Sequence, residues 1–156
     1  MRKLEVVGLV VVALALSGCS DPVLQTTQCV SYADLSDAQA KADVADLVIV
    51  GEELGPDGVT GLHGVDATAH TIRVDEVMKG ELEESEIRVI SSPDACGADD
   101  LYPNGDPLAT TGTTQFFISR VDGKWTSASP FVGGVPVGAN GELHWKPNPP
   151  SATPEP

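Results

Sequence analysis

Apolar and polar positions alternate along several short segments of the chain. In residues 67–78, His70, Ile72 and Val74 fall on one side, and the positions between them are polar. This period of two is typical of a strand with one buried face. A compact apolar run ends at Gly51, which we expect to form a β-bulge. The same reasoning predicts further strands at residues 47–51, 86–91, 113–121 and 124–129.

Turn and capping signals separate these segments. Ser36 and Gln39 have the spacing of a capping box, which predicts a short helix ending near Ala45. The sequence Gly-Pro-Asp-Gly at residues 55–58 predicts a turn, and Asp-Gly at residues 122–123 predicts a hairpin. One early helix and five short strands predict a mainly β fold, a small antiparallel barrel or sandwich. A barrel has the advantage that its closure removes free sheet edges.

The N-terminal segment, residues 1–18, has the pattern of a bacterial lipoprotein signal peptide. Arg2 and Lys3 precede an apolar run over residues 6–16. At about 1.5 Å per helical residue, this run covers roughly half of a hydrocarbon core of about 30 Å. The sequence Leu-Ser-Gly-Cys ending at Cys19 resembles a lipobox, whose cysteine receives a diacylglycerol and becomes the mature N-terminus. A secreted protein with an unmodified Cys19 is the alternative.

These features predict an extracytoplasmic lipoprotein held on the cell membrane by its acyl chains, palmitate among them. Its segments are the signal peptide, a tether over residues 19–28, a domain over residues 29–145 and a proline-rich tail over residues 146–156. We expect the tether and tail to be disordered, because neither can bury a core.

Charge narrows the choice of partners. The 156 residues include 9 Lys and Arg against 23 Asp and Glu, a formal net charge of −14. Such a surface repels phosphate backbones, and with only 4% aromatic residues it also lacks base-stacking platforms, so we expect no nucleic-acid partner. Anionic headgroups are repelled as well, so the lipid at Cys19 must provide the membrane contact. We expect a monomer.

Cys29 and Cys96 remain if Cys19 carries lipid. An even pair in an oxidising compartment predicts a disulfide, worth about 4 kcal/mol in the chain-entropy model. Two free thiols are the alternative, and zinc is disfavoured because two sulfurs lack further ligands.

Several fragments together resemble the netrin-like domain, which occurs in the tissue inhibitors of metalloproteinases and in bacterial exported proteins. They are Cys29 before a short helix and residues 45–51, 77–80, 92–97, 115–118 and 122–124. The resemblance implies a five-stranded OB-type barrel and places the family's bridge on Cys29 and Cys96.

The chain differs from the inhibitors of this family at the residue through which they bind the protease zinc. Their first cysteine is the mature N-terminus and chelates the protease zinc through its free amine. Cys29 lies inside the mature chain, so its nitrogen is an amide. Ser31 stands where the family has a second cysteine, and the matching position near Ala128 or Ser129 also lacks one. Metalloproteinase inhibition by that mechanism is therefore not expected.

No familiar catalytic motif is present, so we expect a protein that is not an enzyme and needs no cofactor. His70 is interpreted as a strand residue; no role is assigned to His63 or His144. The acidic stretch of Asp94, Asp99, Asp100 and Asp106 is interpreted as a solvated loop, with a weak calcium site as the alternative.

A partner surface is the remaining option. Lys124, Trp125 and Phe131 are its candidates, although these aromatic residues could instead cap the barrel end. The sequence thus favours a non-catalytic binding or envelope-associated module with an envelope protein as its partner. Accessory roles in cell-envelope enzyme chemistry or in calcium-dependent interaction are the alternatives.

Overall fold

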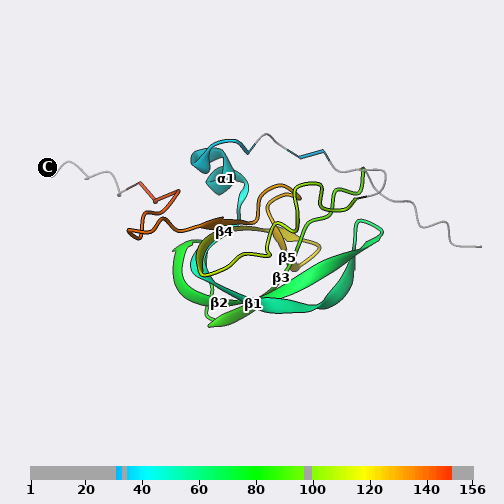
Figure 1. Ribbon diagram of the computed structural model, residues 1–156, viewed down its shortest axis with the longest axis horizontal. Coiled ribbons are helices and arrows are strands. Elements are labelled where there is room, and N and C mark those ends of the chain that lie inside the picture. The colour runs from blue at the N-terminus through cyan, green and yellow to red at the C-terminus, as the bar shows by residue number, and fades with distance from the viewer. Residues whose placement is uncertain (1–30, 33–34, 97–99, 149–156) are drawn as a thin grey trace, which may run out of the picture.

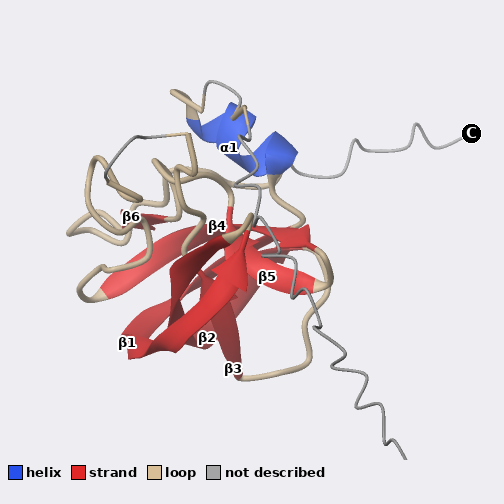
Figure 2. Cartoon of the chain, turned by 90° about the vertical axis from the view of Figure 1, so that its right-hand side faces the viewer, coloured by secondary structure: helices blue, strands red, loops and turns tan. Residues whose placement is uncertain are grey.

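The computed structural model describes residues 31–32, 35–96 and 100–148. Within them the chain forms a helix and six strands, and β1 to β5 close into a ring in the order β1-β2-β3-β5-β4, with β4 pairing again with β1 (Figures 1 and 2). The mainly β, OB-like barrel with a short N-terminal helix is thus confirmed. The elements are α1 (Ala38–Val44), β1 (Leu47–Leu62), β2 (Val65–Lys79), β3 (Glu86–Ile90), β4 (Thr113–Val121), β5 (Lys124–Ser127) and β6 (Gly134–Pro136).

Two long-range pairings close the ring. Leu47 on β1 pairs with Ile118 on β4 in an antiparallel ladder. On the other side, β3 and β5 meet through one parallel pairing, Ile90 with Thr126. The predicted antiparallel arrangement therefore holds for every ladder of the described residues except this one. A short strand that the sequence did not predict, β6, pairs with the first part of β4.

The turn predicted at residues 55–58 is wrong. β1 continues through it to Leu62, and the chain reverses at His63 and Gly64, whose φ angles are 53° and 80°. Gly55 takes a positive φ of 126° where the register with β2 shifts. Pairing with the continuous strand β2 overrides the local turn preference, so these residues form bulges.

The helix begins one residue later than the capping box predicts. Asp37 is the N-cap, and its side chain accepts a hydrogen bond of 2.7 Å from the backbone N–H of Ala40. Ala42 on α1 and Ala45, the C-cap residue, pack against Val48. The helix therefore covers the outer face of the barrel beside β1 and β4.

The barrel interior is filled by apolar side chains from four strands and from the β3–β4 connection. Leu108 is the member from the connection and is fully buried. No helix in the described ranges is long and apolar enough to cross a membrane. The interior cluster consists of Leu47, Ile49, Ile72, Ile87, Val89, Leu108, Phe116 and Ile118.

Candidate functional site

A buried histidine on β2 lies between two carboxylates. His70 is only 3% exposed. Its Nδ1 lies 2.8 Å from Oε1 of Glu53 on β1, and its Nε2 lies 3.0 Å from Oδ2 of Asp106 in the β3–β4 connection. An ionised carboxylate only accepts hydrogen bonds, so both ring nitrogens must carry a proton to make both bonds. The geometry therefore favours the imidazolium form of His70.

The surroundings raise the pKa of His70 and lower the pKa of Asp106. Burial alone would lower the pKa of His70, but the hydrogen bonds to Asp106 and Glu53 and their charges raise it above its usual 6.5. Burial would raise the pKa of Asp106, but hydrogen bonds from His70, Ser91 and the Leu108 N–H, together with the charge of His70, lower it below 3.8. The ion pair is therefore most stable between these two shifted values.

Further hydrogen bonds join the β3–β4 connection to the barrel. The hydroxyl of Ser91 donates to Oδ1 of Asp106, which also accepts from the Leu108 N–H at 3.0 Å. The Tyr102 hydroxyl donates to the Ser91 carbonyl at 3.2 Å and accepts from the Thr68 N–H at 3.0 Å. Side chains of this connection thus bind both β2 and the end of β3.

The polar cluster does not have the order of a nucleophilic triad. Ser91 is fully buried, and its hydroxyl donates to a carboxylate rather than to a histidine. The polar cluster instead holds a proton on His70 and positions the β3–β4 connection. Sequence reasoning placed His70 inward correctly but found neither of its partners. Glu53 was missed because the strand was predicted to end at Gly51.

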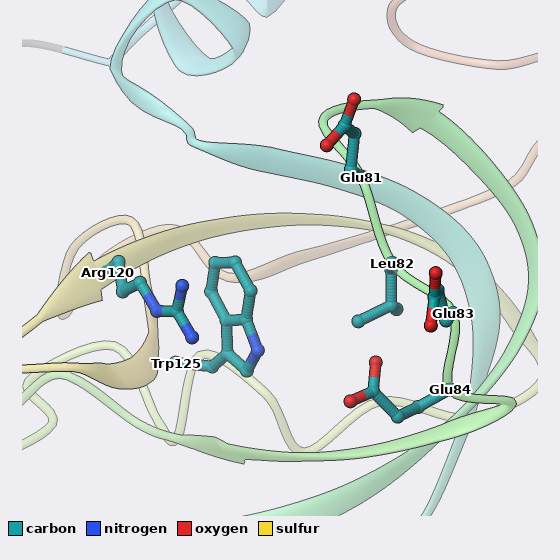
Figure 3. A pocket seen from close by; sticks show the side chains of 6 residues that line it. All are labelled: Glu81, Leu82, Glu83, Glu84, Arg120 and Trp125. Carbon is teal, nitrogen blue, oxygen red and sulfur yellow. The ribbon is translucent and has the colours of Figure 1, made fainter.

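A second feature is a groove at one end of the barrel (Figure 3). Its volume is about 320 Å³, and the β2–β3 connection and the β4–β5 hairpin form its walls. The guanidinium of Arg120 lies 4.5 Å from the ring centroid of Trp125, within cation–π range. Trp125 and Leu82 both pack against the interior cluster. The lining residues are Glu81, Leu82, Glu83, Glu84, Arg120 and Trp125.

The predicted partner surface is only partly brought together. Trp125 is half-buried and lines the groove, whereas the ammonium of Lys124 binds the carbonyl of Gly61 at 3.1 Å. Phe131 is 49% exposed and is not a groove residue. Arg120 was missed, although it pairs with Trp125 across the predicted Asp-Gly hairpin, and that spacing could have identified it.

The acidic stretch does not form a common site in the part of the chain that the structure describes. Asp106 binds His70, while Asp100 accepts from the Tyr102 N–H and Asp94 accepts from the Cys96 N–H. Asp99 lies outside the described residues. Among the others, no group of three or more His, Cys, Asp or Glu side chains could hold a metal ion.

The lipidation and disulfide predictions fall largely outside the described residues. Cys19 and Cys29 both lie there, so lipid attachment and the Cys29–Cys96 bridge stay predictions. His63 lies at the β1–β2 hairpin tip, and Nε2 of the exposed His144 lies 3.0 Å from the Pro136 carbonyl oxygen.

Comparison with protein-family models gave no match, and comparison with curated proteins gave none either. The resemblance to netrin-like domains therefore remains an expectation drawn from sequence fragments, and any function has to be argued from the groove and the polar cluster.

Proposed function

We propose that this chain is a lipid-anchored extracytoplasmic lipoprotein whose netrin-like barrel acts as a non-catalytic binding module for an envelope protein. The lipobox ending at Cys19 supports the anchor, and the closed five-stranded ring supports the family resemblance. OB-type barrels commonly bind their partners on one strand face and the adjacent loops. The groove at the barrel end is such a place.

The half-buried Trp125 beneath Arg120 is the observation that carries this proposal. Tryptophan and arginine are the residues most often found at the energetic centre of protein interfaces. Within the described part of the chain the guanidinium of Arg120 makes no ion pair, so its N–H groups are available to acceptors on a partner.

Charge indicates the kind of partner. The β2–β3 connection brings the carboxylates of Glu81, Glu83 and Glu84 to the rim of the groove, and the whole chain carries a formal charge of −14. Figure 3 shows Leu82 projecting from the same connection toward the indole. A basic protein surface with an apolar centre complements this arrangement, and charge complementarity accelerates its association.

Site-specific photo-cross-linking in intact envelopes tests the proposal. A photoreactive residue in place of Glu83 should give a discrete protein adduct, and raised salt should reduce its yield. Val59 on β1 is 68% exposed and serves as the control position, where we expect no such adduct.

Arg120→Ala and Trp125→Ala should each reduce the yield at position 83 at least tenfold, because each removes a central contact. Arg120→Ala is the cleaner variant, since Arg120 is exposed whereas Trp125 packs on the core. Equal adducts at positions 83 and 59, or an adduct that is unaffected by Arg120→Ala, would contradict the proposal.

A further inference from the structure

The link between His70 and the β3–β4 connection depends on one proton. When His70 is an imidazolium, both ring nitrogens donate to carboxylates, Glu53 on β1 and Asp106 in the connection. Loss of either proton leaves a lone pair facing an ionised oxygen about 3 Å away. The cluster, which is almost closed to water at His70, then holds two negative charges and no positive charge.

The surroundings of His70 offer no other charge to compensate. From β1 it faces Glu53, and from the β3–β4 connection it faces Asp106, with the neutral Tyr102 hydroxyl nearby. β3 contributes the uncharged Val89, which pairs with His70, and the Ser91 hydroxyl on Asp106. Within the described residues, the two carboxylates are therefore the charged groups that offset the effect of burial and keep His70 protonated.

The residues that follow Asp106 also make contacts that stabilise the barrel outside this cluster. Leu108, two residues further on, is fully buried in the interior cluster. The carbonyl of Pro107 accepts a hydrogen bond of 2.8 Å from the Gly134 N–H at the start of β6. Detachment of Asp106 would therefore loosen an interior side chain and the β6 pairing together.

We propose that Glu53, His70 and Asp106 form a proton-dependent latch. The latch holds residues 100–108 against the barrel while His70 carries both ring protons, and it releases this segment when His70 loses one of them. A group whose pKa is raised in the closed state stabilises that state fully below its open-state pKa. This stabilisation is lost as the pH rises to the closed-state pKa. The latch is therefore closed between the lowered pKa of Asp106 and the raised pKa of His70, and it opens as the pH rises above the latter.

Amide hydrogen exchange measured against pH tests the latch. Protection factors, which remove the intrinsic pH dependence of exchange, are compared for the amides of Gly105 and Leu108. We expect the opening equilibrium to rise about tenfold per pH unit from about pH 6.5 up to the raised pKa of His70, and then to level off. The Val74 amide, bonded to the Ser85 carbonyl where β2 meets the β2–β3 connection, reports on the barrel itself and should not follow this rise.

Glu53→Gln separates the latch from a general effect of pH. The amide introduced at position 53 can donate to Nδ1 of neutral His70, while Nε2–H donates to Asp106, so both bonds survive deprotonation. The alkaline rise in opening should then disappear. Glu52→Gln is the matched control, because Glu52 is bonded to the exposed Arg73 instead, and this variant should keep the rise.

An NMR titration of the His70 ring in the unmodified chain gives an independent readout. Both ring nitrogens should be protonated below the midpoint, and the Gly105 and Leu108 amides should shift with the same midpoint. The latch is overturned if the loop amides show no alkaline rise in opening, if the rise persists in Glu53→Gln, or if the ring and the loop titrate separately.

Discussion

Gly51 shows how a single residue shapes the barrel. A Cβ atom at this position would lie 2.0 Å from the carbonyl oxygen of Arg73 on β2. The register between β1 and β2 shifts between Val50 and Gly51, but the extra residue, Asp75, lies on β2, so Gly51 faces the irregularity and does not form the predicted bulge itself. The two strands approach so closely at this point that only glycine fits.

Gly51→Ala should therefore destabilise the fold by about 1–3 kcal/mol, the usual cost of forcing extra volume into a packed site. Gly61→Ala is the control, because no atom lies within 4 Å of a Cβ at Gly61. Urea unfolding of the two variants checks this prediction. Equal losses of stability would show that the close approach at Arg73 is not the cause.

Single residues also show which features could be predicted from the sequence and which could not. Period-two alternation identified His70 and Ile72 as inward-facing, and both are buried. The partners of His70 could not be predicted, because Glu53 and Asp106 come from segments that only the closed barrel brings together. Asp106 was interpreted as part of a solvated loop for the same reason. A local pattern carries no information about such long-range contacts.

At the scale of elements, α1 depends on its first residue. The helix spans only Ala38–Val44, and the Asp37 side chain satisfies the backbone N–H of Ala40. Asp37→Ala should lower the stability of the protein by about 1 kcal/mol, whereas Asp37→Asn, which keeps a capping oxygen, should cost much less. Thermal unfolding of both variants measures the difference, and equal effects would mean that the cap contributes nothing.

The strands were predicted more reliably where hydrophobic alternation was strong than where turn residues intervened. β4 occupies Thr113–Val121, as expected, and the hairpin at Asp122 and Gly123 is confirmed by φ angles of 50° and 76°. β1 was predicted too short, since backbone pairing with β2 absorbs the glycines at residues 55–58 as bulges. β6 was missed because it spans only three residues and depends on the β4 edge.

At the scale of the whole molecule, the proposed lipid anchor must overcome the electrostatic repulsion between the acidic chain and the membrane. A chain with a net charge of −14 is repelled by anionic membranes, so the proposed attachment would depend on acyl chains at Cys19. In cells fed an alkyne-tagged palmitate, the protein should carry the tag, and Cys19→Ala should lose it. Ser20→Ala is the neighbouring control and should keep it.

A label that persists in Cys19→Ala would place the lipid elsewhere and contradict the proposed anchor. A non-reducing peptide map of the membrane-extracted protein would also test lipid attachment at Cys19. The N-terminal peptide should carry the mass of the lipid. The map also reports on the predicted bridge, because Cys29 and Cys96 should appear in one linked peptide.

The way the ring closes has a consequence for how fast the chain folds. The β1–β2 hairpin is local, but Leu47 must find Ile118, and Ile90 must find Thr126, across long stretches of chain. Folding rates fall as such distant contacts increase, because loop entropy is lost before the contacts form. We therefore expect the hairpin to form early, while closure of the ring limits the rate. During the proposed export, the chain would therefore pass through a period with open strand edges before the barrel closes.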